Sequence, residues 1–410
     1  MKRALLLTIL CAFSAAFSPW MTWGAPSKVS CVDPCGGGDF TDLQAALSAA
    51  ESNSVLDFIK VAQGTYTDNF TYESDQGYAI LIYGGYKPCT GCAIRELDPS
   101  KTILDGSCDG SVLVIKNNLN GDIVVDGFTI QNGSGSTAYY GGGVDAVSDN
   151  NETTGIVSAG NITITNNIVT RNAAISNGGG IYASSQSTVG AAGDIIVNNN
   201  IIYENSVADY DGGGVLAESY SSSGMAGNVI MINNLIYNNS AGRFGEGVAA
   251  SSDTHSGTAG TIRLINNTIT ENCDTGVCYG LFMSAKTVYC YNNIVWGNTD
   301  SLGADIYLNS EIVTAQGANN DYESLFGSWT VSGLNLHVNP LLTSKYHLNS
   351  RSPCIDMGKN DPPGGLPSTD FEGDTRIIDG NNSGVATVDI GADEYVPKRT
   401  IAPFLILLLN

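Results

Sequence analysis

Short apolar stretches alternate with polar residues along the middle of the chain, and this alternation recurs with a long period. Four copies read NITITNN, DIIVNNN, NVIMINN and TIRLINN, and each places its apolar side chains on one face of a strand. Every copy runs into an Asn-Asn pair that opens a second motif, as in NNIIYEN from Asn199 and NNLIYNN from Asn233. The pattern predicts short strands with one buried face, separated by turns.

Glycine runs mark a third position of the same repeat. GGG begins at Gly141, Gly178 and Gly212, GEG begins at Gly245, and the starts are 37, 34 and 33 residues apart. Glycine adopts positive φ and lets backbones approach closely, so we expect tight corners that lead into narrow inward-facing columns. The expected inward columns are Val144, Ile181, Val215 and Val248, followed by Ala146, Ala183, Ala217 and Ala250.

Three strands per repeat, with no helical periodicity between them, favour a coil in which each repeat makes one turn. A propeller blade needs a fourth strand, and a leucine-rich repeat needs its leucines. In such a coil every strand pairs in parallel with its equivalents in the neighbouring turns, about 4.8 Å away. The repeat therefore predicts an all-β solenoid in which equivalent residues form columns along the axis.

Two polar columns follow from this stacking. The second Asn of each pair is expected at a sharp turn, where Asn tolerates left-handed backbone and its amide hydrogen-bonds the copies above and below. This column is Asn167, Asn200, Asn234, Asn267 and Asn293. A second column is expected outside the coil, where its tyrosines either stack on each other or offer rings to sugars. It is Thr170, Tyr203, Tyr237, Thr270 and Trp296.

The NNxIxxN and GGGI motifs together resemble the right-handed parallel β-helix repeat proteins of the pectate-lyase-like superfamily. The run DFTDLQAALSAA, followed by DFIKVAQGTYTDNF, is similar to the segment that opens many such chains with a short helix that plugs the open end. Thr41 and Gln44 are expected to form a capping box where this helix starts. The stretch SPCIDMGKNDPP and the later VDIGADEY resemble the segment that closes choice-of-anchor Q proteins, which are secreted and vary in how they attach to the cell.

This resemblance implies a right-handed parallel β-helix with an N-terminal capping helix and an irregular C-terminal cap. The first residues are basic, then apolar, then small, which is typical of a secretory signal peptide. The chain is divided into a signal peptide (1–25), the β-helix with its N-terminal cap (26–345), the C-terminal cap (346–396) and a basic-apolar tail (397–410). The apolar run of the tail is shorter than the roughly 20 residues that span a bilayer, so we expect no integral membrane domain.

Nine of the ten cysteines follow the signal peptide, which makes disulfides the expected state after export. An odd number leaves at least one thiol unpaired. Cys31, Cys35, Cys89 and Cys92 have a second interpretation, a zinc site with four thiolates. Disulfides are also expected to staple the irregular C-terminal cap.

The chain carries 18 Lys and Arg against 40 Asp and Glu, a formal charge of 18 − 40 = −22, and has no basic stripe. Nucleic acid and anionic membranes are excluded as partners, because phosphate binding needs clustered basic residues. An anionic polysaccharide would be repelled unless Ca²⁺ bridged the like charges. Asp209 and Asp211 are the candidate ligands for such an ion. We expect an extracellular or bacterial cell-surface monomer whose partner is a polysaccharide or cell-envelope glycan.

Outward positions of the repeat supply the candidate site. Over about four turns, or roughly 15 Å, aromatic rings and carboxylates would share one face that suits a sugar chain. The candidate ligand-binding residues are Tyr140, Asp145, Tyr182, Asp211, Glu218, Arg243 and Glu246. Arg243 is a candidate lyase base, and Asp211 and Asp145 are candidate catalytic acids. The alternative is a solvated face of mixed polar residues.

Polysaccharide lyases of the resembled superfamily use calcium-binding carboxylates with a basic side chain, and the related hydrolases use paired aspartates near a Gly-His-Gly. This chain has no Asp-Asp pair, and none of His255, His337 and His347 lies between two glycines. We therefore expect a glycan-binding or adhesion protein, with a polysaccharide lyase or glycoside hydrolase as the alternative.

Overall fold

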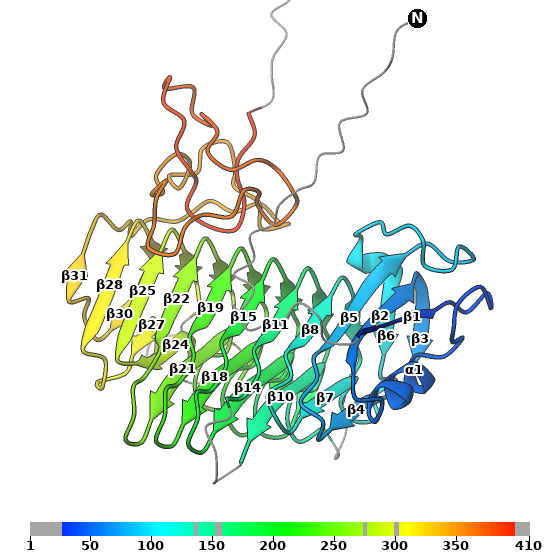
Figure 1. Ribbon diagram of the computed structural model, residues 1–410. Helices are drawn as coiled ribbons and strands as arrows, with labels where there is room; N and C mark the ends of the chain where they lie inside the picture. Colours follow the sequence, from blue (N-terminus) through cyan, green and yellow to red (C-terminus); the bar gives the residue numbers. More distant parts are fainter. Residues whose placement is uncertain (1–26, 135–137, 152–157, 274–276, 299–302, 398–410) are drawn as a thin grey trace, which may run out of the picture.

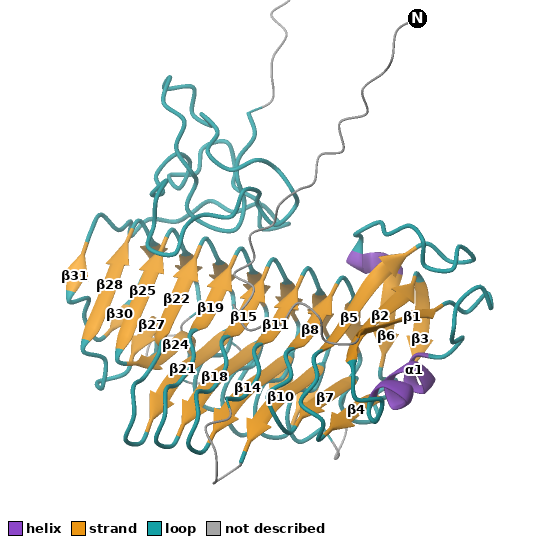
Figure 2. Ribbon diagram, in the orientation of Figure 1, coloured by secondary structure: helices purple, strands orange, loops and turns teal. Residues whose placement is uncertain are grey.

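The computed structural model describes residues 27–134, 138–151, 158–273, 277–298 and 303–397. Over most of this length the chain winds as a right-handed parallel β-helix, with the strands of successive turns stacked side by side (Figure 1). Figure 2 shows that strands build the solenoid and that helix is confined to its N-terminal end. The fold predicted from the repeat and the resemblance is confirmed. The predicted signal peptide and residues 398–410 of the predicted tail lie outside the described residues.

Three parallel sheets run along the solenoid. Sheet 1 contains β1 (Ser27–Val32), β2 (Leu56–Ala62), β5 (Ile80–Tyr86), β8 (Ile123–Asp126), β11 (Ile162–Thr165), β15 (Ile195–Asn198), β19 (Val229–Ile232), β22 (Thr261–Ile265), β25 (Thr287–Tyr291), β28 (Thr314–Ala318) and β31 (Val331–Ser332). Sheet 2 contains β4 (Phe70–Ser74), β7 (Leu113–Asn117), β10 (Val144–Asn150), β14 (Ile181–Ser187), β18 (Val215–Ser221), β21 (Val248–Thr254), β24 (Tyr279–Ala285), β27 (Ala304–Leu308) and β30 (Leu325–Phe326). Sheet 3 contains β3 (Gly64–Thr67), β6 (Thr102–Asp105), β9 (Thr129–Gln131), β12 (Ile168–Thr170), β16 (Ile201–Tyr203), β20 (Leu235–Tyr237), β23 (Thr268–Thr270), β26 (Ile294–Trp296) and β29 (Asp321–Tyr322). The remaining elements are a two-stranded sheet of β13 (Ala173–Ala174) and β17 (Ser206–Val207), helix α1 (Leu43–Ala50) and a 3-10 turn, η1 (Pro99–Lys101).

In the central repeats the chain passes from sheet 1 through the Asn-Asn pair to sheet 3, and then through the glycine corner to sheet 2. The predicted inward columns pair in register, for example Val215 with Val248 and Ala217 with Ala250, and all eight of their side chains are buried. Apolar side chains from the three sheets fill the coil and form one continuous core. The second inward position after each of these corners is alanine, so little side-chain volume has to fit there and the turns can stack closely.

The Asn-Asn pairs divide two tasks that the sequence analysis had assigned to one residue. The second Asn of each pair forms the predicted ladder: the backbone N–H of Asn200 donates to Oδ1 of Asn234 at 3.0 Å, and Nδ2 of Asn234 donates to Oδ1 of Asn267 at 2.9 Å. The left-handed backbone belongs instead to the first Asn, with φ of 55° at Asn199 and 61° at Asn233. A parallel amide ladder, not predicted, closes sheet 3 through Asn172, Asn205, Asn239, Asn272 and Asn298.

The glycine corners have the geometry expected from the repeat. Gly178 has φ of 66°, in the left-handed region that favours glycine. A Cβ on the next residue, Gly179, would lie 2.4 Å from the carbonyl oxygen of Ser206 in the following turn. The run is therefore required by both the corner and the stacking.

Helix α1 covers the N-terminal end of the solenoid, as predicted. Its buried Leu43 and Leu47 belong to the same core cluster as the solenoid interior. The predicted capping box is wrong in both residues: the N-cap is Asp42 and not Thr41, and Oδ1 of Asp42 accepts the backbone N–H of Ala45 at 2.8 Å. The Gln44 amide reaches across to β4 instead, where it pairs with the main chain of Thr71.

The four cysteines of the N-terminal region form two disulfides, so the alternative of a zinc site with four thiolates is wrong. Cys31 pairs with Cys92 and Cys35 with Cys89, which ties the start of the chain to the loop after β5. A third bond closes a short loop between Cys273 and Cys278. Among the described residues no disulfide lies in the C-terminal cap, so the expectation that disulfides staple that cap is wrong.

Polar contacts hold the C-terminal cap instead. This segment follows β31 with little regular structure and lies over the turns between sheets 1 and 3 of the later repeats (Figure 1). The first Asn of successive pairs binds its backbone: Nδ2 of Asn233 donates to the Thr369 carbonyl at 2.7 Å, and Nδ2 of Asn266 donates to the carbonyls of Asp389 and Gly391 at 3.0 Å. Asn292 likewise exchanges two hydrogen bonds with the main chain of Lys359.

A buried arginine lies at the centre of this cap. Arg376 is 4% exposed and donates to Oε2 of Glu394 at 3.4 Å, to the carbonyls of Ala392 and Asp393, and to Oδ1 of Asn233. Arg376 therefore connects two segments of the cap with each other and connects the cap with the solenoid. No helix among the described residues is long and apolar enough to cross a membrane.

Candidate functional site

Most of the predicted site residues lie on or beside the outer face of sheet 2. Strand pairing brings one outward position of seven successive strands into register, and we call this row the outer column. It runs Asp145, Tyr182, Leu216, Ala249, Phe282, Tyr307 and Phe326. The row changes from acidic and hydroxylated at β10 and β14 to aromatic at β24, β27 and β30. The sequence analysis had identified its first half only.

Asp145 is the most unusual residue of the row. Its side chain points to the outside of the sheet, yet it is only 6% exposed, and its Oδ1 has no hydrogen-bond partner. Burial raises the pKa of this carboxyl to about 6, and Lys116 of the preceding strand offsets part of that increase. A buried oxygen without a donor is costly, and a ligand can reach this one only when the groups that cover it move aside.

Tyr182 and Glu218 form a hydrogen-bonded cluster next to Asp145. The Tyr182 hydroxyl donates to Oε1 of Glu218 at 2.6 Å, and the Ser184 hydroxyl donates to the same oxygen at 2.9 Å. The ring of Tyr140 stacks on that of Tyr182 with centroids 4.9 Å apart and is 37% exposed. The structure thus brings together Tyr140, Asp145, Tyr182 and Glu218, although Tyr182 is buried rather than exposed.

Asp211 and Arg243 pair with each other beside this face. The Arg243 guanidinium donates to both carboxylate oxygens of Asp211, at 2.8 and 2.5 Å. Cζ of Arg243 lies 5.4 Å from the ring centroid of Tyr210. The hydrogen bond to Asp211 raises the pKa of Arg243 above its already high usual value. A lyase base must give up its proton, so this pairing disfavours Arg243 in that role.

Glu246 lies in the glycine corner, and its carboxylate is turned into the protein. It is 2% exposed, and its Oε2 accepts the backbone N–H of Tyr279 at 2.6 Å. Burial raises the pKa of Glu246 to about 7. Three strand spacings separate its turn from that of Asp145, or about 14 Å, which exceeds the separation of paired carboxylates in glycosidases.

The calcium site stays a prediction. Asp209 is exposed in the loop before the third glycine run, while the Asp211 carboxylate is occupied by Arg243 and by the backbone N–H of Phe244 at 3.1 Å. Neither residue belongs to a cluster of three potential metal ligands within the described part of the chain.

Aromatic rings that the sequence analysis missed continue the outer column toward the C-terminal end. The centroids of Tyr307 and Phe326 are 4.6 Å apart with planes 8° apart, and Phe282 stacks on Phe244 at 5.0 Å. Phe326, at the last turn, is 54% exposed. Phe282, Tyr307 and Phe326 follow the last glycine run, where the motif ends, so only the strand register relates them to Tyr182.

The tyrosines predicted on sheet 3 stack on each other. Tyr203 and Tyr237 are parallel within 3°, with centroids 4.9 Å apart, and Tyr346 of the cap covers Tyr237 at 4.1 Å. Tyr237 is therefore packed between two rings and has no free face for a sugar, while a ring covers one face of Tyr203. The expectation that the whole column is exposed is wrong for Thr170 and Thr270, which are 1% and 3% exposed.

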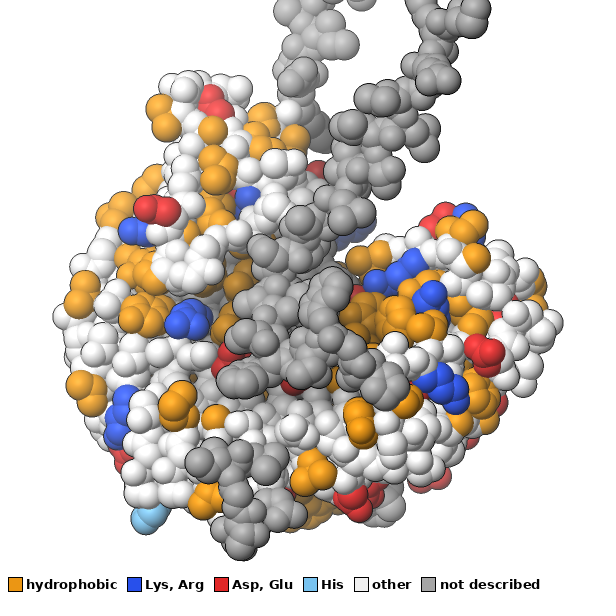
Figure 3. All heavy atoms as spheres, in the orientation of Figure 1, with side chains coloured by type: hydrophobic (Ala, Val, Ile, Leu, Met, Phe, Trp, Pro, Cys, Tyr) orange, Lys and Arg blue, Asp and Glu red, His pale blue; other side chains and the backbone are white. Residues whose placement is uncertain are grey.

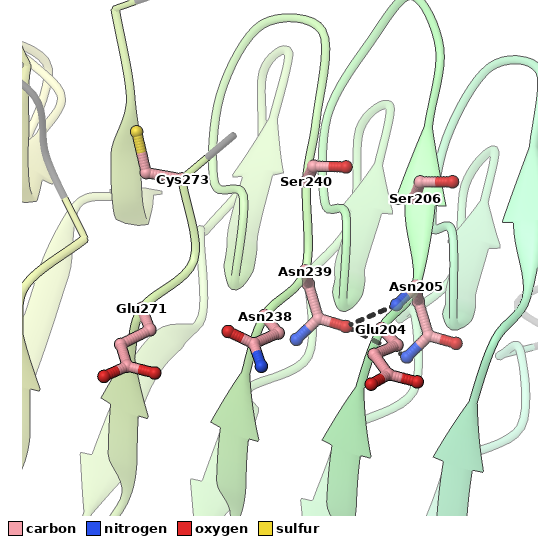
Figure 4. A pocket seen from close by; sticks show the side chains of 8 residues that line it. All are labelled: Glu204, Asn205, Ser206, Asn238, Asn239, Ser240, Glu271 and Cys273. Atoms are coloured by element: carbon pink, nitrogen blue, oxygen red, sulfur yellow. Dashed lines mark hydrogen bonds between the residues drawn. The ribbon is translucent and has the colours of Figure 1, made fainter. Parts of the chain in front are cut away.

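A shallow polar pocket lies where sheet 3 ends (Figure 4). Side chains of Glu204, Asn238 and Glu271 stand in a row on successive turns, each on left-handed backbone, above the buried amide ladder. Glu271 already accepts the hydroxyl of Tyr346 at 2.8 Å. Position six of the NNxIxxN motif marks this row in the sequence, so it could have been recognised there.

Comparison with known proteins adds no assignment to this geometry. No family model matches the chain, and neither a curated protein nor a solved structure matches it. Figure 3 shows one face of the molecule, on which the basic side chains form no continuous stripe along the solenoid. The structure therefore supplies the fold, and the function has to be argued from the outer face of sheet 2.

Proposed function

We propose that this chain is an exported β-helix protein that binds an uncharged glycan along the outer face of sheet 2. The observation that carries the proposal is the exposed ring of Tyr140, which stacks on Tyr182 beside the unpartnered Oδ1 of Asp145. Sugar hydroxyls are donors, and a carboxylate in a low-dielectric setting is a strong acceptor for them. Aromatic rings next to such an acceptor supply the apolar contact that sugar C–H groups need.

Charge favours a neutral polymer over a uronate. Asp145 and Glu218 place carboxylates at this end of the outer face, and of the two nearby cations Arg243 is paired with Asp211, while Lys116 lies close enough to Asp145 to lower its pKa. With a net charge of −22, the protein repels an anionic chain at long range. Polymers of neutral hexoses or N-acetylated amino sugars carry no charge, so neither the local carboxylates nor the net charge of the protein repels them.

The disulfides support an extracellular setting, since such bonds persist in oxidising compartments. The resemblance of the repeat to pectate-lyase-like proteins and of the C-terminal segment to choice-of-anchor Q proteins supports the same location. A surface-attached solenoid would hold its long sheet 2 parallel to a glycan chain, which suits adhesion as well as simple binding.

The test is a titration of the purified chain with neutral and uronic-acid oligosaccharides by calorimetry, following a glycan-array screen. Asp145→Asn keeps the shape and removes the charge, so we expect about tenfold weaker binding of the neutral ligand. Asp209→Asn makes the same charge change at an exposed position and should leave the Kd unchanged. Equal affinity of both variants, or binding of uronates alone, would refute the proposal.

A hydrolase is the second candidate, and the raised pKa of Asp145 favours it over a lyase. A carboxyl with a pKa of about 6 stays partly protonated near neutral pH, as a general acid requires. Incubation with the bound glycan and Ca²⁺ distinguishes the candidates. Shortened products that disappear in Asp145→Asn would establish hydrolysis, and an intact glycan would leave binding as the function.

A further inference from the structure

Three metal-ligating side chains meet in the C-terminal cap, far from the outer face of sheet 2. Nδ1 of His347 lies 3.0 Å from Oδ1 of Asp393 and 3.4 Å from Oε2 of Glu372, and all three atoms lie within 4.8 Å of one another. We propose that His347, Glu372 and Asp393 bind a divalent transition-metal ion of the Zn²⁺ type, which fastens the cap.

The spacing and the donor types match such an ion. Ligand atoms about 2.0–2.1 Å from Zn²⁺ are about 3.3 Å apart in a tetrahedral arrangement, close to the two separations measured from the imidazole nitrogen. One nitrogen and two carboxylate oxygens suit Zn²⁺ and related ions, whereas Ca²⁺ takes six to eight oxygens. Glu372 is exposed, so the remaining position would be open to water.

Contacts outside the triad hold the ligands in place. Oδ2 of Asp393 accepts the backbone N–H of Leu348 at 2.7 Å, which leaves Oδ1 directed at the imidazole. The ring of Phe371 stacks on that of His347 with centroids 5.6 Å apart and planes 21° apart. Such outer contacts orient ligands in established metal sites.

The local charge also favours a cation. Asp370 and Asp374 flank Glu372 in the chain, so this region holds more carboxylates than one imidazole can neutralise. The cation buried nearby, Arg376, is already paired with Glu394. A divalent ion would balance this excess of negative charge more fully than a protonated imidazole.

The ligands come from three separate segments, so an ion would act as a crosslink. His347 lies between the bridged Leu342 and Leu348, Glu372 lies between the bridged Thr369 and Thr375, and Asp393 lies near the end of the described residues. No disulfide joins these segments within the described residues. Metal binding would take the place of such a bond in this cap.

The experiment titrates ZnCl₂, and in parallel CaCl₂, into the full-length protein after EDTA treatment, by calorimetry. We expect one Zn²⁺ per chain, no comparable Ca²⁺ binding, and slower proteolysis of the cap with Zn²⁺. Glu372→Gln and His347→Gln should each weaken Zn²⁺ binding by about tenfold or more, while Asp374→Asn, a neighbouring exposed charge change, should not.

Glu372 is exposed, so its variant tests binding even if His347→Gln loosens the cap, and circular dichroism checks the fold of each. Absence of saturable Zn²⁺ binding, or the same Kd in Glu372→Gln as in Asp374→Asn, would overturn the proposal. In that case the triad is a cluster of polar side chains that holds no metal ion.

Discussion

Replacing Asn234 by alanine removes one link of the buried amide ladder. Oδ1 of Asn234 accepts the backbone N–H of Asn200 at 3.0 Å, and its Nδ2 donates to the Val197 carbonyl at 2.7 Å. Asn234 is fully buried, so water cannot replace these partners. Each buried polar group left unsatisfied costs about 1–3 kcal/mol, and two such groups give about 2–6 kcal/mol of local destabilisation.

A local measurement suits this change better than a melting curve, because long repeat arrays depart from two-state unfolding. The amide proton of Asn200 reports the broken bond directly in peptide-resolved hydrogen exchange. Each 1.4 kcal/mol corresponds to a factor of ten, so exchange at Asn200 should accelerate by about 30-fold or more. Amides several turns away should change little, since each turn contacts only its neighbours.

The matched control is Asn382→Gly in the cap, where an exposed Asn on left-handed backbone is replaced by the residue that adopts this conformation most easily. It should change stability by less than about 0.5 kcal/mol. If exchange at Asn200 in Asn234→Ala stayed within twofold of the unaltered chain, the amide ladder would not stabilise the coil as argued.

Two further predictions concern the C-terminal cap. Arg376→Met leaves the buried Glu394 carboxylate without its cation, which costs about 3–5 kcal/mol, so limited proteolysis should remove the cap while the solenoid stays intact. The exposed Arg351→Met is the control, and an equally resistant cap in both variants would contradict the argument. Burial, and then Glu394, raises the pKa of Asp389 to about 8, above an unfolded value of about 3.9. The folded cap therefore binds this proton more tightly, and the resulting stability is full below about pH 4 and is lost as the pH rises through 8. Urea unfolding at pH 5 and 8 should show this loss and Asp389→Asn should reduce it; equal pH dependence in both would count against it.

The repeat could be predicted because its residues act in identical surroundings on every turn. The second Asn, the glycine corner and the inward Val and Ala positions each solve one local problem, so the same residue recurs and its period reveals the coil. The two tasks of the Asn-Asn pair could not be separated in this way. Both residues recur with the same period, and only backbone dihedrals show that Asn199 turns the chain while Asn200 builds the ladder.

Burial of the candidate site could not be predicted from alternation. A strand pattern assigns Asp145 to the outside of sheet 2, but it does not show that other groups cover this side chain. The contacts of the cap were equally hidden, because they join residues such as Asn233 and Arg376, which are 143 positions apart, and follow no period. Disulfide pairing could not be predicted for the same reason, because the paired cysteines follow no period either.

Variation along the solenoid points to function more directly than repetition does. A residue that recurs on each turn, such as Asn234 or Ala217, is explained by the stacking of like on like, and its loss damages the coil. Where the residue at one position differs from turn to turn, the stacking of the turns does not require a particular side chain there. The outer column changes from Asp145 to Phe326 within one register, so its side chains are free to form a surface that differs along the axis. An acidic, hydroxylated end and an aromatic end then give a bound polymer a direction, which a uniform ladder could not provide.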